Sequence, residues 1–301
     1  MFRLGTPIHT MLLNAIIAGA DQLNRESREE LKRFIKSQYK EGAFVNRAGQ
    51  KDVYYTVFGI MIMWVLGMKI DRKAISTYLR NIEYNTLNEV DFIALRFVRT
   101  LLRICSVPLS WAIMIDYVPG TKKILEILFS FDQPIHIGAR ATPYQLYLDS
   151  ILFGATGKNR FAPEELLSRL APYRCSEGGF TNIDSSQKTI SANATSAGYL
   201  AQFSCGIRDT SSAEALRKLQ FAGGGFFSSQ VSPLPDLLST ATSLLVWACE
   251  GITPNEETKE YVVSLWTEGG GFSATLFDDE SDVEYSFYGL LALGSVKLVK
   301  K

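Results

Sequence analysis

A repeated turn constrains the fold of this chain more than any other feature of its sequence. In four places a glycine-rich turn ends in a phenylalanine, which is followed by a polar stretch and then by an apolar run. The last three of these phenylalanines are 46 residues apart, and the first precedes the second by 136 residues, close to three further periods. A fixed period of this size indicates repetition of one supersecondary unit. The four phenylalanines are Phe44, Phe180, Phe226 and Phe272.

The apolar run after each turn predicts a helix that begins at an equivalent place. With Phe226 aligned on Phe272, Asp236 aligns with Asp282, ten residues after the phenylalanine in both copies. Asp52 takes this place in the first copy. Two degenerate copies should fill the long interval that follows it, and a proline in the first helical turn suits the second of them. We expect six helices of this kind, which begin near residues 52, 91, 142, 190, 236 and 282.

A second kind of helix precedes the glycine turn in each copy. Its apolar residues recur at helical spacing among charged ones, so one face should meet water. The repeating unit is therefore a helical hairpin. Six hairpins predict a single all-α domain over residues 1–301, an α/α toroid with the apolar helices inside and the amphipathic helices outside. An open solenoid is the alternative, usually with more repeats and polar end caps. Examples of the amphipathic helix are residues 27–39, 163–174, 211–220 and 255–266.

The composition excludes several classes of function. The chain has 31 basic and 31 acidic side chains, so it lacks the basic excess that nucleic-acid-binding proteins use to contact phosphates. The longest apolar run, residues 57–66, is about half as long as a membrane-spanning helix, and we expect no membrane span. The four cysteines lack the paired spacing of zinc fingers or redox pairs, so a reducing cytoplasm is the simplest compartment.

These repeats carry a family resemblance. Gly-Gly-Phe, then about ten residues, then Asp before a polar pair and an apolar helix resembles the repeat of protein prenyltransferase β-subunits and terpenoid (squalene) cyclases. The resemblance runs from about residue 27 to the end, and it is weak between about 75 and 160. It implies an α/α toroid of six hairpins that handles isoprenoids. Protein prenyltransferases also work with an α-subunit, although no residue here identifies a protein partner.

The zinc site of the prenyltransferases is not matched. The resemblance implies an Asp-x-Cys pair at the start of the fifth inner helix and a His at the start of the sixth. Asp236 matches the first ligand, but Leu238 and Tyr285 take the places of the other two. Zinc in proteins is held by four donors, mostly nitrogen or sulfur, so one carboxylate is not enough. We therefore expect no zinc.

The acid of the cyclases is not matched either. The resemblance implies an Asp-x-Asp-Asp motif that protonates the substrate, and the equivalent stretch here is residues 235–241. Leu238 and Ser239 replace the two central acids, and neither side chain can protonate an alkene. Whether the protein is an enzyme is left open. In a divergent enzyme, Asp236, Asp282 and Glu284 are the candidates for catalytic groups.

An acidic loop offers a possible magnesium site. Asp278, Asp279 and Asp282 match an Asp-Asp-x-x-Asp pattern, and carboxylates suit magnesium when a phosphate completes its shell. The competing interpretation is a solvated loop in which Asp282 caps the following helix. We favour the cap and expect no cofactor.

The inner helices also carry residues suited to a ligand cavity. An aromatic lining would accept an isoprenoid or another apolar small molecule. Arg47, Lys51 and Lys188 lie between a glycine turn and its helix, where they could meet an anionic headgroup or simply lie on the surface. The predicted cavity residues are Asp52, Tyr54, Tyr55, Tyr285, Phe287 and Tyr288.

Two functions remain open after these observations. The first is a divergent prenyltransferase-like or terpene-cyclase-like protein that handles an isoprenoid or other apolar ligand in a central cavity. The alternative is a toroid without catalysis, which binds an apolar ligand or another protein.

Overall fold

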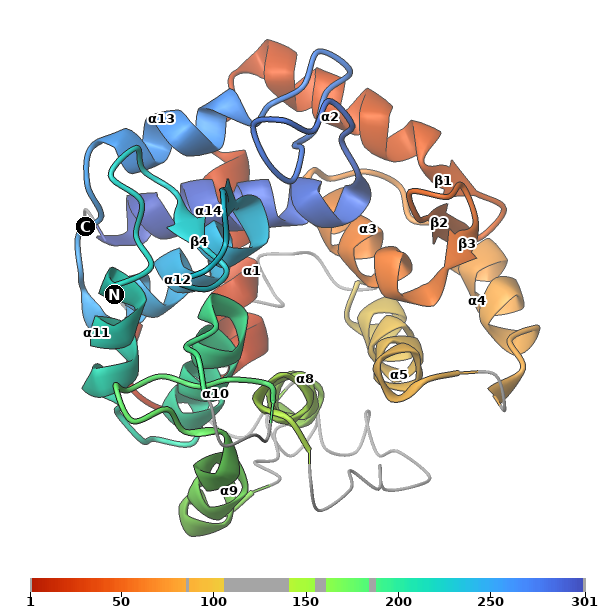
Figure 1. The fold of residues 1–301 in the computed structure, drawn as a ribbon. Helices are drawn as coiled ribbons and strands as arrows, with labels where there is room; N and C mark the ends of the chain where they lie inside the picture. Colours follow the sequence, from red (N-terminus) through yellow and green to blue (C-terminus); the bar gives the residue numbers. More distant parts are fainter. Residues whose placement is uncertain (1, 85–86, 106–140, 155–160, 184–187, 300–301) are drawn as a thin grey trace.

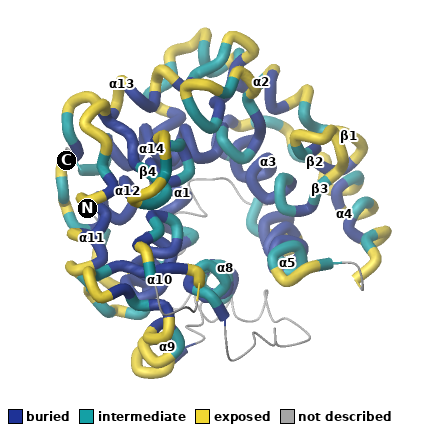
Figure 2. The backbone as a smooth tube through the Cα atoms, in the orientation of Figure 1, coloured by how far each residue is buried: buried dark blue, intermediate teal, exposed yellow. Residues whose placement is uncertain are grey.

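The inner layer of the molecule is a ring of apolar helices. The computed structural model describes residues 2–84, 87–105, 141–154, 161–183 and 188–299, and these residues form a ring around a central axis (Figure 1). Most residues of the inner helices are buried, less completely in α5 and α8 than in the other four, whereas the exposed residues gather on the outside of the ring (Figure 2). The inner helices are α3 (Val53–Val65), α5 (Glu89–Ile104), α8 (Pro143–Gly154), α10 (Ala192–Ser204), α12 (Leu237–Glu250) and α14 (Val283–Val299).

The ring of inner helices is closed. Each inner helix packs against the next one along the chain, and the last, α14, packs back against the first, α3. An open solenoid has no such contact between its ends. The fold is therefore the all-α, α/α toroid that the repeat predicted.

The outer helices cover this ring with one buried face each. In α2, for example, Leu31, Phe34 and Ile35 are buried among exposed charged residues. The outer partner expected before α8 lies outside the described residues. Those described are α2 (Arg25–Ser37), α4 (Arg72–Arg80), α9 (Pro163–Leu170, continued by the short 3₁₀ helix η2, Ala171–Tyr173), α11 (Thr210–Arg217) and α13 (Glu257–Ser264).

The repeated phenylalanine joins each turn to its inner helix. Phe226 is fully buried, and its backbone N–H donates to the Thr240 hydroxyl at 2.9 Å. That hydroxyl in turn donates to the Asp236 carbonyl at 2.6 Å, one turn earlier in the helix. One side chain thus satisfies a buried backbone donor and fixes the turn against the helix. The same donor bonds join Phe44 to Thr56, Phe180 to Thr195 and Phe272 to Ser286.

Antiparallel backbone pairing places the start of three inner helices, α3, α12 and α14, opposite this phenylalanine. Phe44 pairs with Asp52, Phe226 with Asp236, and Phe272 with Asp282. A glycine one turn further along the helix then leaves room for the ring, because a Cβ on Gly289 would lie 2.3 Å from Phe272. The strands are β1 (Tyr39–Lys40), β2 (Ala43–Val45) and β3 (Lys51–Asp52) in one antiparallel sheet, and β4 (Phe226–Phe227) with β5 (Pro235–Asp236) in another.

An additional helix, α1 (Ile8–Ala20), crosses one end of the ring. It contacts α14 and α3 on one side and α8 and α10 on the other, so it spans the ring from side to side. Its crossing with α14 is so close that a Cβ on Gly294 would lie 1.7 Å from the Ala15 carbonyl oxygen. The repeat does not predict this helix because it lies before the first copy.

Two helix starts, those of α5 and α10, differ from the expected ones by two residues. The helices expected near 52, 142, 236 and 282 begin one residue later. In contrast, α5 begins at Glu89 with Asn88 as its cap, two residues before the expected Asp91. Helix α10 begins at Ala192, and Ser191 caps it rather than Ile190, because only a polar side chain can accept the free N–H of the first turn.

Within the described residues, no helix combines the length and the apolar character needed to cross a membrane.

Candidate functional site

An aromatic pocket lies between four of the inner helices. Side chains from α3, α5, α8 and α14 form its walls, and Leu12 of α1 also contributes. Its lining is almost entirely apolar, and its free volume is about 60 Å³. Its aromatic lining residues are Tyr54, Phe58, Phe97, Tyr144, Tyr147, Phe287 and Tyr288.

The rings of the pocket pack around Phe58, edge to face with Tyr54 and at tilted angles with Phe287 and Tyr288. The Phe58 ring lies 4.9 Å from Tyr54, 5.1 Å from Phe287 and 5.8 Å from Tyr288, measured between ring centroids. Edge-to-face arrangements of this kind satisfy the quadrupoles of neighbouring rings. The pocket wall is therefore a packed aromatic cluster that joins α3 to α14.

Polar groups gather at one edge of the pocket. The Tyr54 hydroxyl donates to Glu284 Oε1 at 3.0 Å and lies 3.0 Å from the Tyr144 hydroxyl. A phenol has one proton to donate, so Tyr54 accepts from Tyr144 while it donates to the Glu284 carboxylate. Burial raises the pKa of Tyr144 to about 12, which keeps this phenol neutral at physiological pH. A directed chain of hydrogen bonds therefore leads from the pocket wall to Glu284.

Glu284 is a carboxyl group that titrates near neutral pH. Burial is the main cause, and it raises the pKa of Glu284 to about 7. The negative charges of Asp282 and Asp52 add to the effect, whereas the hydrogen bonds from Tyr54 and Tyr55 oppose it. A carboxyl group with a shifted pKa beside a pocket is a typical candidate for a functional residue.

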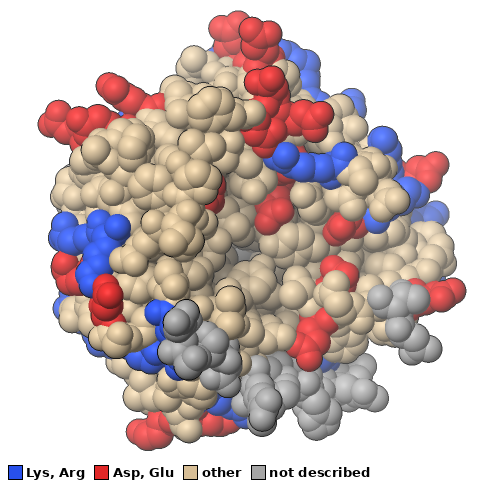
Figure 3. Space-filling model, viewed as in Figure 1, with Lys and Arg blue, Asp and Glu red and all other residues tan. Residues whose placement is uncertain are grey.

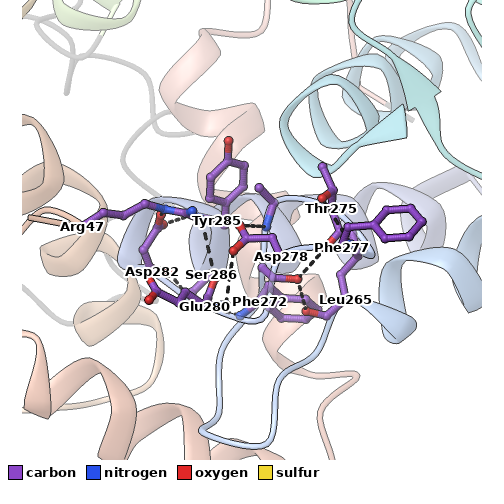
Figure 4. A network of polar contacts seen from close by, with 12 residues as sticks. Arg47, Leu265, Phe272, Thr275, Phe277, Asp278, Glu280, Asp282, Tyr285 and Ser286 are labelled. Atoms are coloured by element: carbon purple, nitrogen blue, oxygen red, sulfur yellow. Dashed lines mark hydrogen bonds and ion pairs between the residues drawn. The ribbon is translucent and has the colours of Figure 1, made fainter. Parts of the chain in front are cut away.

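Asp282 is held by an arginine from the first repeat. Arg47, from the loop between β2 and β3, donates through Nε to Asp282 Oδ2 at 2.6 Å and through Nη2 to Asp278 Oδ2 at 2.7 Å (Figure 4). Its guanidinium also lies over the Tyr285 ring, 5.2 Å from the centroid. Burial raises the pKa of Asp282 even though Arg47 acts in the opposite direction. Arg47 thus joins the first repeat to the last at the mouth of the ring.

The same arginine occupies the possible magnesium site. Two of its three carboxylates, Asp278 and Asp282, are ion-paired with Arg47, and the third, Asp279, is exposed. Asp282 Oδ1 is also used, since it accepts the Tyr285 N–H at 2.7 Å as a helix cap. Over the described part of the chain, no three His, Cys, Asp or Glu side chains are grouped so that they could hold a metal ion.

The other two candidate aspartates also cap helices. Asp236 accepts the backbone N–H and the hydroxyl of Ser239, at 2.7 and 2.8 Å, and burial raises its pKa. Asp52 Oδ1 accepts the N–H groups of Tyr54 and Tyr55, at 2.8 and 3.1 Å. Such caps typically stabilise a helix by about 1 kcal/mol. Helix capping therefore accounts for where both side chains point.

The predicted site residues lie in three different places in the structure. Tyr54, Phe287 and Tyr288 line the pocket, and Glu284 lies at its edge. Asp52, Tyr55, Asp282 and Tyr285 do not line the pocket, although the first three act on the pKa of Glu284. Asp236 lies at the start of α12, which contributes no wall residue.

Sequence reasoning missed about half of the aromatic wall. One missed residue, Phe58, lies on α3 of a regular copy, whereas Phe97 on α5 and Tyr144 and Tyr147 on α8 belong to the degenerate copies. Their spacing gives a weak signal, since Tyr144 and Tyr147 are three residues apart and hence share a helix face. Without a recognisable repeat around them, that face could not be assigned to the centre of the ring.

The comparisons with known proteins agree with this architecture. The sequence model of the family described as "Prenyltransferase alpha-alpha toroid domain" matches residues 6–87 and 159–300, well over half of the chain. No curated protein matches the chain significantly. The unmatched interval contains α5 and α8, the two helices of the degenerate copies. The chain belongs to the prenyltransferase alpha-alpha toroid domain family.

Proposed function

We propose that this protein is a divergent member of its family that binds an isoprenoid or another apolar ligand in the aromatic pocket. The observation that carries the proposal is the pocket itself, an apolar recess whose few polar groups, Tyr54, Tyr144 and Glu284, gather at one edge. Ligand sites typically combine an apolar lining with a small number of placed polar groups.

The size of the pocket limits how the ligand enters. A free volume of about 60 Å³ is roughly that of two water molecules in the liquid, so an isoprenoid tail requires the wall to yield. Val90 and Tyr144 are only partly buried at the first turns of α5 and α8, where movement costs least. We expect ligand entry at these two helix starts, with rotation of the wall side chains.

The chemistry of the better-known relatives is not part of the proposal. Leu238 and Tyr285 replace two zinc ligands implied by the resemblance, and Arg47 neutralises the carboxylates of the alternative magnesium site. A carboxyl group with a pKa of about 7, such as Glu284, is also far too weak an acid to protonate an alkene. We therefore propose binding without a resident metal and without acid-initiated cyclisation.

Proton transfer on a bound ligand is the second candidate function. One observation favours it: Glu284 has a pKa near neutral, the range in which a side chain works well as a general acid or base. Asp236 and Asp282 support proton transfer less, because both already accept hydrogen bonds as helix caps.

For the compartment we keep the reducing cytoplasm, which the four free cysteines support.

A titration with farnesol tests the binding proposal. Val90→Trp places an indole at the partly buried entrance of the pocket, and Val263→Trp places one on the exposed outside of α13 as the matched control. We expect calorimetry to detect farnesol binding to the wild type and the control, with at least tenfold weaker binding, about 1.4 kcal/mol, to Val90→Trp. Equal binding by all three proteins, or no binding by any, would contradict the proposal. The second result would favour a toroid that serves protein interaction.

A further inference from the structure

Three carboxylates lie beside the polar edge of the pocket, which we call its mouth, and give it an excess of negative charge. Asp52, Asp91 and Glu284 come from the first turns or caps of α3, α5 and α14, three helices that are neighbours in the ring. Their charges act on one another, because Asp52 helps burial to raise the pKa of both Asp91 and Glu284. In Figure 3, acidic side chains border one side of the central hollow. The aromatic pocket therefore opens toward a region of negative potential.

Little positive charge balances these groups. Within the described residues, none of the three carboxylates forms an ion pair with a lysine or arginine, whereas Arg47 pairs only with Asp278 and Asp282. Partly buried carboxylates without a counter-charge raise the free energy of the protein, and a bound cation would lower it. An anionic diphosphate bound beside these carboxylates would raise the free energy further, because like charges repel.

The chain already holds one cation at this mouth by the same combination of groups. The Arg47 guanidinium contacts the Asp282 carboxylate at 2.6 Å and lies 5.2 Å from the Tyr285 ring centroid. Aromatic faces attract cations through their quadrupole, and a neighbouring carboxylate adds a direct charge interaction. The Tyr54 ring, bonded through its hydroxyl to Glu284, offers a second pairing of ring and carboxylate at the edge of the pocket.

We infer that the natural ligand carries a protonated amine beside Glu284 and an apolar body among the aromatic rings, and not a diphosphate. This inference rests on the proposed function, because it specifies the ligand of the same pocket. The cavity defines the site, and the carboxylates at its mouth define the charge of the ligand. Glu284 is the positioning group for the amine, and Tyr54 orients its carboxylate.

Three probes with one tail test the inference. Farnesylamine, farnesol and farnesyl diphosphate differ only in the head group, and each is titrated into the full-length protein at pH 7.5 below its aggregation concentration. We expect farnesylamine to bind at least tenfold more tightly than farnesol, and the diphosphate to bind most weakly. Farnesol binding as tightly as the amine, or the diphosphate binding most tightly, would overturn the inference and leave the proposed function standing. If none of the three probes binds, both this inference and the proposed function are contradicted.

A charge-removing variant separates the carboxylate from the shape of the pocket. Glu284→Gln keeps the size of the side chain, and Glu280→Gln removes an exposed acid four residues earlier as the matched control. We expect Glu284→Gln to weaken farnesylamine binding about tenfold more than it weakens farnesol binding, and Glu280→Gln to change neither. A loss of farnesol and farnesylamine binding to the same extent in Glu284→Gln would overturn the charge assignment. Val90→Trp should weaken amine binding at least tenfold as well, and unchanged amine binding in this variant would show attachment outside the pocket.

Discussion

The four regular repeats and the two degenerate ones differ in what they contribute to the toroid. In the regular repeats, a buried phenylalanine donates its N–H to a threonine or serine on the inner helix, as Phe226 does to Thr240. In the interval between them, α5 and α8 supply about half of the pocket wall, including Phe97, Tyr144 and Tyr147. The family match also stops at residue 87 and resumes at 159. The difference suggests that the regular copies maintain the ring while the divergent copies specify its ligand.

The largest test of this division compares two phenylalanines. Phe226→Ala should reduce the free energy of unfolding by about 3–5 kcal/mol. The Phe226 ring is fully buried, and its centroid lies 5.0 Å from the centroid of the Trp247 ring. Phe97→Ala should cost less, since the Phe97 ring borders an existing space. Chemical denaturation measures both variants. Equal losses would remove the distinction between the two regions.

The second test removes one hydroxyl from a regular repeat. Thr240→Val preserves the shape of the side chain but leaves the Phe226 N–H without its acceptor, so we expect a loss of about 1–3 kcal/mol. Thr242→Val is the matched control, because its hydroxyl donates only to Asn193 and to carbonyls of its own helix turn. Denaturant midpoints that shift alike in the two variants would show that the repeated hydroxyl has no special role.

The third test uses the pH dependence of stability to check that the pKa of Glu284, at the edge of the pocket, is raised. The pKa of Glu284 is about 7 in the folded protein and near 4.5 when unperturbed, so the folded state binds a proton that the unfolded state has released. Stability should therefore fall as the pH rises from about 4.5 through 7. Relative to Glu284→Gln, we expect the wild type to lose about 2–3 kcal/mol between pH 5 and pH 8.

The comparison with this variant isolates one group among several. Glu284 is faced by Asp52, Tyr54 and Tyr55 of the first repeat, by Tyr144 of α8, and by Asp282 of its own repeat. Those groups are present in both proteins, so their titration cancels in the difference. Parallel stability curves for wild type and Glu284→Gln would show that Glu284 has an ordinary pKa.

The smallest expected effect on stability belongs to the degenerate region. Tyr144→Phe removes a hydroxyl at the pocket edge and retains the ring, so unfolding should change by about 1 kcal/mol or less. Farnesylamine binding should nevertheless weaken, because Tyr54 loses the donor that supports its bond to Glu284. A stability loss as large as that of Thr240→Val, measured by the same denaturation, would place Tyr144 in the framework.

The fold could be predicted from the sequence because its repeated elements obey local rules. An aspartate or serine caps the helix, and a threonine or serine four residues later binds the phenylalanine N–H, as Asp282 and Ser286 do. In three of the four copies a glycine three residues after that, such as Gly289, makes room for the ring. The helix α1 escaped prediction because it lies before the first copy. Its place across the ring depends on contacts between residues far apart in the sequence, such as Ala15 and Gly294.

The site could be predicted only in part, for a related reason. Tyr54, Phe287 and Tyr288 could be assigned to the centre because their helices follow clear repeats. Arg47 was considered for an anionic ligand, whereas the structure pairs it with Asp278 and Asp282, an ion pair between the first and last repeats. Such a pairing depends on ring closure, which no local pattern encodes.

Photo-crosslinking with a diazirine analogue of farnesol tests the central claim most directly. After irradiation of the complex and digestion, mass spectrometry identifies the labelled peptides. We expect labels on residues 89–104 and 143–154, the divergent helices, together with residues 54–61 of α3 and 287–288 of α14. Labels confined to the outer helices or to α10 and α12 would contradict the assignment of ligand binding to the divergent repeats.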